Sequence, residues 1–126
     1  MMMGMNSPIT IVYGIPNCDT VKKARAWLSA QGVDYQFHDF KKLGVPPTRL
    51  AAWQAALGWE KLVNRQGATW RKLNAVAQAG VHDAASASTL LQAQPSIIKR
   101  PVVEWADGRI SCGFDAQRWS ELLPPR

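Results

Sequence analysis

The chain has 126 residues, of which 47% are hydrophobic and 19% charged, a composition typical of one globular domain with a single core. No apolar stretch reaches the roughly 18 residues that a membrane-spanning helix needs, so we expect a soluble protein without a membrane partner. The net charge of +6 would suit nucleic acid, but lysine and arginine are spread along the chain in short pairs. We therefore expect this charge to attract small anions rather than nucleic acid.

Cysteine usage favours a reducing, cytoplasmic location. Cys18 and Cys112 are too few for a disulfide framework and too far apart in sequence for a zinc finger. His38 and His82 have no cysteine or carboxylate nearby at a metal-ligand spacing, so we expect no metal. Residues 1–8 lack the features of a signal peptide, and we interpret them as a disordered tail with an uncertain start codon.

The first part of the chain predicts a β-α-β unit. Residues 9–13 read as a buried strand that ends at a glycine and a proline. Residues 20–30 carry apolar side chains at helical spacing, and residues 33–40 alternate in the manner of a second strand. Such a unit implies parallel pairing of the two strands and a right-handed crossover.

The middle of the chain is predicted to be helical. A first helix is expected to begin at a Thr48 cap and to end near residue 58. A second helical stretch should run on to about residue 73, and a third should span 86–94, before a proline. Together these helices form a predicted insertion over about 45–95.

The last part predicts a hairpin and a helix. An Asp-Gly pair at 107–108 lies between strand-like residues 101–105 and 109–113, which is a strong hairpin signal, and a helix should follow over 114–123. The order β-α-β, helices, β-β-α predicts an α/β thioredoxin-like fold with a mixed four-stranded sheet and a helical insertion. We expect one domain over residues 9–126, and nothing in the pattern suggests assembly, so a monomer is expected.

Cys18 is the strongest candidate for chemistry because it lies between the first strand and the first helix. The N–H groups of a first helical turn have no intrahelical partner and carry partial positive charge, which stabilises a thiolate and lowers the pKa of the thiol. Lys22 lies one turn further on, and its side chain can lean back toward the sulfur. A small buried packing residue is the alternative interpretation of Cys18, and it is our preferred interpretation of Cys112.

Three blocks of sequence, in order, resemble the arsenate reductase (ArsC) family, and in particular its branch of YffB-like and Spx-like proteins. The blocks are residues 13–24 (YGIPNCDTVKKA), 64–73 (NRQGATWRKL) and 97–103 (IIKRPVV). The resemblance covers nearly all of residues 9–123 and implies the same thioredoxin-like fold.

The resemblance also implies roles for individual residues. Cys18 matches the family's nucleophile, Arg100 an arginine that stabilises the anion and the thiolate, and Arg65 a second anion clamp. Pro101 matches a proline that follows a cis bond and faces the thiol. From the residues themselves, Asn17 and Thr20 are expected to orient the loop through side-chain hydrogen bonds to the backbone.

One departure from the family pattern affects the expected substrate. A third family arginine is absent, and Cys112 and Gly113 stand at the aligned positions. An oxyanion held by fewer guanidinium groups loses strong charge-assisted hydrogen bonds, so we do not expect arsenate to be a good substrate. Pairing of Cys112 with Cys18 is left open.

The expected function is a glutathione-dependent thiol reductase. No second cysteine follows Cys18 after two intervening residues, so an external thiol should resolve the mixed disulfide or thiol adduct. The carboxylates of glutathione suit a basic cleft. The substrate would be a small oxidised or anionic compound. The alternative is a non-catalytic, Spx-like regulator that binds RNA polymerase, although such regulators typically carry a Cys-x-x-Cys switch that this chain lacks.

Overall fold

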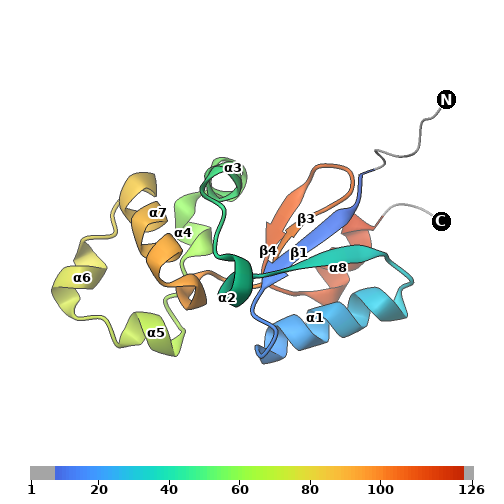
Figure 1. The fold of residues 1–126 in the computed structure, drawn as a ribbon, viewed down its shortest axis with the longest axis horizontal. Coiled ribbons are helices and arrows are strands. Elements are labelled where there is room, and N and C mark those ends of the chain that lie inside the picture. The colour runs from blue at the N-terminus through green and yellow to red at the C-terminus, as the bar shows by residue number, and fades with distance from the viewer. Residues whose placement is uncertain (1–7, 124–126) are drawn as a thin grey trace.

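A computed structural model describes residues 8–123 of the chain (Figure 1). The tail predicted at 1–8 therefore lies, apart from Pro8, outside the described residues, as do the final prolines. In the described part, four strands form one sheet in the order β2-β1-β3-β4. The strands are β1 (Thr10–Gly14), β2 (Tyr35–Asp39), β3 (Val102–Glu104) and β4 (Ile110–Cys112). The helices are α1 (Asp19–Ala30), α2 (Phe40–Leu43), α3 (Pro47–Leu57), α4 (Trp59–Leu62), α5 (Ala68–Arg71), α6 (Ala75–Ala79), α7 (Ala84–Ala93), the 3-10 helix η2 (Pro95–Ile97) and α8 (Ala116–Leu122).

The β-α-β unit has the predicted arrangement. Strands β1 and β2 pair in parallel, with Thr10 opposite Tyr35, and α1 connects them. Helix α1 buries Val21, Ala24 and Leu28, which recur at helical spacing on one face. It begins one residue earlier than predicted, at Asp19, because Cys18 takes the N-cap position.

The hairpin prediction is also confirmed. Strand β3 pairs antiparallel with both β1 and β4, which makes the sheet mixed. The backbone N–H of Trp105 donates to the carbonyl of Arg109 at 2.8 Å and closes the turn. Gly108 has a φ of 95°, a conformation that favours glycine, so the Asp-Gly signal has a direct structural cause.

The sheet separates two apolar clusters. On one face, α1 and α8 pack against β1 and β3 through a cluster that includes Leu28, Trp119 and Val103. On the other face, the helical insertion packs through a cluster that includes Trp53 and Leu91. Figure 1 shows the insertion helices extending to the left of the sheet, while α1 and α8 lie with it on the right.

Two details of the middle helices differ from the prediction. Helix α3 begins after Pro46, and its first residue is a proline, so Thr48 is not the cap. The stretch predicted as one helix to residue 73 is broken after α4, because Val63 pairs with Ile98 in an isolated β-bridge. The chain resumes as α5 and then α6, and the start of α6 is capped by the Asn74 side chain, which accepts from the N–H of Ala77 at 2.8 Å.

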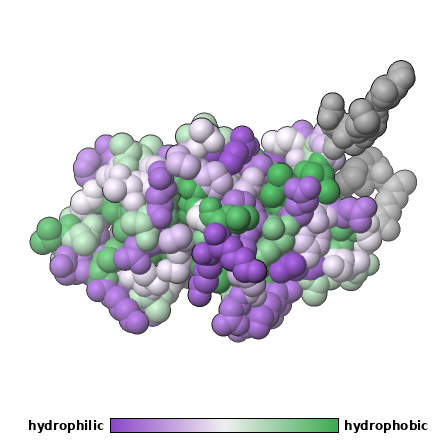
Figure 2. All heavy atoms as spheres, viewed as in Figure 1, coloured by the Kyte–Doolittle hydropathy of each residue, from purple (hydrophilic) through white to green (hydrophobic). Residues whose placement is uncertain are grey.

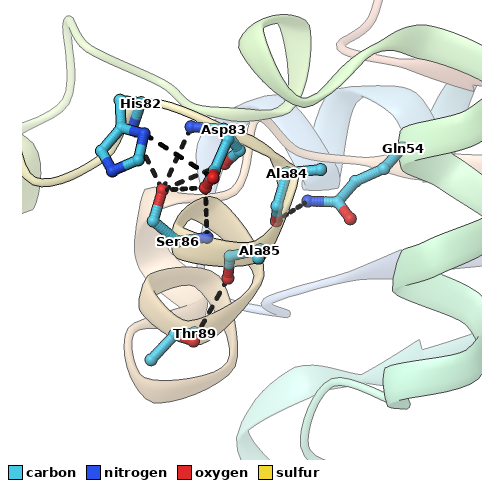
Figure 3. A network of polar contacts seen from close by, with 7 residues as sticks. All are labelled: Gln54, His82, Asp83, Ala84, Ala85, Ser86 and Thr89. Carbon is cyan, nitrogen blue, oxygen red and sulfur yellow. Dashed lines mark hydrogen bonds and ion pairs between the residues drawn. The ribbon is translucent and has the colours of Figure 1, made fainter.

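Helix α7 begins two residues before its predicted start because of a capping box (Figure 3). The Asp83 side chain accepts from the N–H of Ser86 at 2.8 Å, and Ser86 Oγ accepts from the N–H of Asp83 at 3.1 Å. Gln54 of α3 donates to the carbonyl of Ala84 at 3.0 Å, as Figure 3 shows. The start of α7 is thus attached to α3.

A polar cluster around Glu104 joins the insertion to the sheet. Glu104 accepts hydrogen bonds from Tyr13 at 3.0 Å, from Arg49 at 2.8 Å and from Trp53 at 2.8 Å. Burial of Tyr13 and the adjacent Glu104 carboxylate together raise the pKa of Tyr13 to about 12. Strands β1 and β3 and helix α3 therefore meet at one carboxylate.

Candidate active site

Cys18 lies at the junction between β1 and α1. Its backbone is extended, its N–H donates to the carbonyl of Ile15 at 3.1 Å, and its carbonyl accepts from the N–H of Lys22 at 2.9 Å. Gly14 allows the strand to approach the helix, because a Cβ there would lie 2.9 Å from a methyl carbon of Val21. The thiol is consequently held at the start of a helix that packs closely on the sheet.

Arg100 is the charged residue that reaches this thiol. Its Nη2 lies 3.9 Å from Cys18 Sγ, while its Nη1 donates to the carbonyls of Ser96 and, at 3.3 Å, of Ile98. These bonds fix the guanidinium in front of the sulfur. Its Nε is buried and has no hydrogen-bond partner among the described residues. The peptide bond between Arg100 and the buried Pro101 is cis, in agreement with the resemblance.

The surroundings of Cys18 favour its thiolate. Burial raises the pKa of the thiol, but the backbone N–H of Val21, the Arg100 guanidinium and the backbone N–H of Thr20 lower it, and the net pKa is below the ordinary value. The N–H groups are the unpaired donors of the first turn of α1. A thiol with this environment is a better nucleophile near neutral pH than an ordinary cysteine.

Three residues predicted to lie around the thiol, Asn17, Thr20 and Lys22, do not hydrogen-bond to the loop or the sulfur through their side chains as expected, within the described structure. Asn17 and Thr20 make no side-chain hydrogen bond to the loop in residues 8–123, and Thr20 contributes its backbone N–H instead. The expectation that their side chains orient the loop was therefore wrong, because backbone hydrogen bonds already hold it. Lys22 is exposed and is not among the groups that shift the pKa of Cys18.

Arg65 lies apart from the thiol contacts. Its guanidinium stands over the rings of Trp59 and Trp70, at 5.9 and 5.8 Å from their centres. Neither Cys18 nor Arg100 hydrogen-bonds to it in the described part of the chain. The structure therefore brings Cys18 and Arg100 together, with Pro101 directly after Arg100 in the chain, whereas Arg65 lines a separate cavity.

That cavity has a volume of about 490 Å³, within the usual range of ligand pockets. It is lined by Glu60, Lys61, Val63, Asn64, Arg65, Gln66, Lys99 and Cys112. Sequence reasoning missed Lys61 and Lys99, because they lie far apart in the chain and only the bridge between Val63 and Ile98 brings them together. The available signal was that Lys99 directly precedes Arg100.

Cys112 contrasts with Cys18. It is a free, partly buried thiol that packs against the apolar cluster on the insertion side of the sheet. Burial raises the pKa of the Cys112 thiol, although Lys99 and Lys61 act in the opposite direction. Cys112 is therefore a weak nucleophile. Cys18 is also a free thiol, so the two cysteines are not paired in this structure.

The described residues offer neither a metal site of clustered ligands nor a membrane-spanning helix. Over residues 8–123, no group of histidine, cysteine, aspartate or glutamate side chains could hold a metal ion. In the same part of the chain, every helix is too short or too polar to span a membrane.

On the face drawn in Figure 2, hydrophilic side chains gather over α1 and α2.

The family model described as the ArsC family matches residues 13–122, a span that includes Cys18, Arg65 and Arg100. The chain belongs to the ArsC family. Within the family it is similar to the solved structure of the YffB protein, with 44% identity, a TM-score of 0.85 and coverage of 91% of this chain and 99% of the other.

Two further relatives differ in how similar they are to this chain. An arsenate reductase (ArsC) related protein from Brucella melitensis is 46% identical, with a TM-score of 0.72 and coverage of 92% of this chain and 95% of its own. The global transcriptional regulator Spx of Lactiplantibacillus plantarum is 22% identical, and the match spans 92% of this chain and 87% of Spx. The predicted resemblance to YffB-like and Spx-like ArsC proteins is thus confirmed.

Proposed function

We propose that this protein is a thiol-dependent reductase in which Cys18 is the nucleophile and glutathione is the external thiol. The observation that carries the proposal is the placement of Cys18 Sγ 3.9 Å from Arg100 Nη2 at the N-terminus of α1. Both features stabilise a thiolate. Membership of a family that includes an arsenate reductase related protein supports reductase chemistry.

In the proposed reaction, the Cys18 thiolate attacks one sulfur of a substrate disulfide. A bond forms between that sulfur and Cys18, the substrate S–S bond breaks, and the leaving thiolate takes a proton from solvent. A glutathione thiolate then attacks the mixed disulfide and releases Cys18 as a thiolate. A second glutathione reduces the resulting glutathione mixed disulfide, so two glutathione molecules are oxidised to one disulfide for each substrate disulfide reduced.

Arg100 is the residue proposed to hold the thiolate and an anionic part of the substrate. Its Nη1 is committed to backbone carbonyls, and its Nη2 faces the sulfur, so the guanidinium is positioned before any substrate arrives. Pro101 is proposed to form the wall opposite the thiol. Asn17, Thr20 and Lys22 remain proposed contributors to substrate binding, through the exposed loop and the first turn that they occupy.

Arsenate is not the proposed physiological substrate. A tetrahedral oxyanion needs several charge-assisted donors at one point, and Cys112 and Gly113 stand where the family pattern has an arginine. The proposed substrate is a small disulfide or another oxidised or anionic compound. We further propose that the protein acts in the cytoplasm, as a monomer and without a metal.

The test is the pH dependence of alkylation of Cys18, together with mass measurement of a glutathione adduct. Cys18→Ser is the blank, and Cys112→Ser is the matched control that keeps the proposed nucleophile. We expect a pKa below that of an ordinary thiol, an adduct on Cys18 alone, and glutathione-dependent reduction of a small mixed disulfide that Cys112→Ser retains. An ordinary pKa with no adduct would refute the proposal.

A second candidate function is suggested by the match to Spx along 92% of this chain. In this alternative, the protein is a non-catalytic regulator that binds RNA polymerase. Retention of the purified chain on immobilised RNA polymerase, without any turnover of disulfides, would favour the regulator over the reductase. Turnover that depends on Cys18, without retention, would favour the reductase.

A further inference from the structure

The cavity beside Cys112 concentrates positive charge. Lys61 from the end of α4, Arg65 from the following turn and Lys99 from the segment before β3 all line it, and Glu60 is its one acidic lining residue. None of the three cations belongs to a salt bridge within the described residues, where the ion pairs involve other side chains. Positive groups that converge on a cavity without acidic partners favour an anionic ligand.

Lys99 occupies the space next to the position of the missing arginine. A Cβ built on Gly113 would lie 3.1 Å from Lys99 Cε, and Gly113 has a φ of 80° that side chains rarely adopt. The aliphatic stem of Lys99 thus passes directly over Gly113. A cation still reaches this region, but it comes from the segment that precedes β3 and ends in an ammonium rather than a planar guanidinium.

The arrangement of the lining groups indicates what kind of anion fits. Lys61 and Lys99 belong to different segments, joined where the N–H of Lys99 donates to the carbonyl of Leu62 at 2.8 Å. Separate ammonium groups suit separate carboxylates, whereas one tetrahedral oxyanion is held by donors that meet at a point. The amides of Asn64 and Gln66 line the same cavity and offer hydrogen bonds to peptide groups.

We propose that the cavity lined by Lys61, Arg65 and Lys99 binds a small peptide that carries two carboxylates, the chemistry of glutathione. The inference rests on the proposed function and locates the co-substrate of that reaction. Lys61 and Lys99 bind the carboxylates, and Glu60 accepts from the peptide's ammonium group. Cys112 lines the cavity as a packing residue and takes no part in the chemistry.

The cavity is connected to Cys18 through the segment that carries Lys99 and Arg100. Cys18 does not line the cavity, but Lys99 directly precedes Arg100, whose Nη2 lies 3.9 Å from Cys18 Sγ. Contacts to the bound peptide and to the thiolate therefore come from successive residues of one segment. The same segment is fixed by the bridge between Val63 and Ile98.

The test measures binding without chemistry. Cys18→Ser protein is titrated with S-methylglutathione, which has no free thiol, and the dissociation constant is measured by calorimetry. Adding Lys99→Ala or Lys61→Ala should weaken binding by about tenfold each, the loss of one hydrogen bond to a charged group. Arg118→Ala is the matched control, because it removes one positive charge from α8 on the opposite face of the sheet.

Alkylation of Cys112 reports whether the ligand binds in this cavity. In the Cys18→Ser protein, bound S-methylglutathione should slow alkylation of Cys112 several-fold, since this thiol lines the cavity. Glutarate is expected to compete weakly, and sulfate not at all at equal ionic strength. Equal competition by sulfate would overturn the peptide assignment and leave a general anion site. Unchanged binding in both lysine variants, or no protection of Cys112, would overturn the location.

Failure of this inference and failure of the proposed function give different results. If Cys18 forms its glutathione adduct at the same rate in wild-type, Lys61→Ala and Lys99→Ala proteins, the reductase stands and the cavity assignment is wrong. If S-methylglutathione binds and protects Cys112 while Cys18 in the otherwise wild-type protein forms no adduct, the cavity assignment stands and the reductase is wrong.

Discussion

At the scale of single residues, the reactivity of Cys18 depends on donors of two kinds. The N–H groups of Val21 and Thr20 come from the first turn of α1, while the guanidinium comes from Arg100. The first kind is built into any helix start, but the second requires one particular side chain. Substitution of Arg100 therefore separates the two contributions.

The first prediction concerns Arg100→Met, which keeps an unbranched apolar stem but removes the guanidinium. We expect the pKa of Cys18 to rise, and its alkylation near neutral pH to slow by roughly tenfold, the loss of one hydrogen bond to a charged group. Iodoacetamide kinetics followed by mass spectrometry measure the rate, with Lys22→Met as the matched control. An equal effect in both variants would mean that general positive charge, rather than the contact at 3.9 Å, activates the thiol.

The second prediction follows from the lowered pKa of Cys18 in the folded chain. Between that pKa and the ordinary thiol value of about 8.5, the unfolded chain binds more protons than the folded one, so stability rises with pH in this window. The contribution is lost as the pH falls through the folded pKa. Relative to Cys18→Ser, the wild-type protein should thus gain stability as the pH rises from below the folded pKa of Cys18 to about 8.5.

Urea unfolding of both proteins across this range measures the difference. The comparison cancels the opposite effect of Cys112, whose pKa is raised and which both proteins contain. A difference that is constant with pH would contradict the stabilised thiolate.

At the scale of secondary-structure elements, the Glu104 cluster connects α3 to β1 and β3. Glu104 is a partly buried acceptor, with a side chain 15% exposed, whereas Arg49 is 44% exposed. Removing the buried charge should cost more than removing its exposed partner, because the Tyr13 and Trp53 donors also depend on it.

The third prediction is an order of stabilities. Glu104→Gln should lower the free energy of unfolding by about 1–3 kcal/mol, and Arg49→Ala by less than about 1 kcal/mol. Urea denaturation measures both, with the exposed Glu121→Gln of α8 as the control for loss of one negative charge. Equal losses for the two variants would show that the ion pair, rather than the three-donor cluster, carries the stability.

The elements that were predicted correctly have local causes. Period-two alternation identifies β2, and the Asp-Gly pair identifies the hairpin through the φ of 95° at Gly108. The break after α4 could not be predicted in this way, because Val63 pairs with Ile98 instead of continuing the helix. No local sequence pattern indicates so distant a partner. The Thr48 cap was wrong because a proline one residue earlier begins the helix.

The same distinction applies to the candidate site. Cys18 could be identified from its position between a strand and a helix, which is a local feature. Arg100 and Pro101 were identified only through the family resemblance, because the contact from Arg100 to Cys18 spans 82 positions of sequence. The cavity with Lys61 and Lys99 was not predicted, since it depends on how the stem of Lys99 packs over the backbone of Gly113.

At the scale of the whole molecule, the insertion and the sheet share one apolar cluster. Leu91 of α7 and Trp53 of α3 are fully buried in the same cluster as Val102 of β3. The insertion therefore has no core of its own within the described residues. We expect it to unfold together with the sheet.

The fourth prediction tests this dependence with Leu91→Ala, which removes a fully buried side chain from the insertion. We expect a loss of about 2–5 kcal/mol and a single transition seen alike by circular dichroism and tryptophan fluorescence. Val76→Ala in α6 is the control, since Val76 is 82% exposed and should change stability by less than about 0.5 kcal/mol. Two separate transitions would mean that the insertion is an independent folding unit.

The distance in sequence between Cys18 and Arg100 has a consequence for synthesis. During translation the cysteine emerges from the ribosome 82 residues before the guanidinium that faces it. A helix of 12 residues such as α1 is only marginally stable without its tertiary contacts, so the early N–H donors are not yet in place either. The nascent chain therefore carries an ordinary, slowly oxidised thiol, and the sulfur becomes reactive only when α1 and the segment with Arg100 have folded against it.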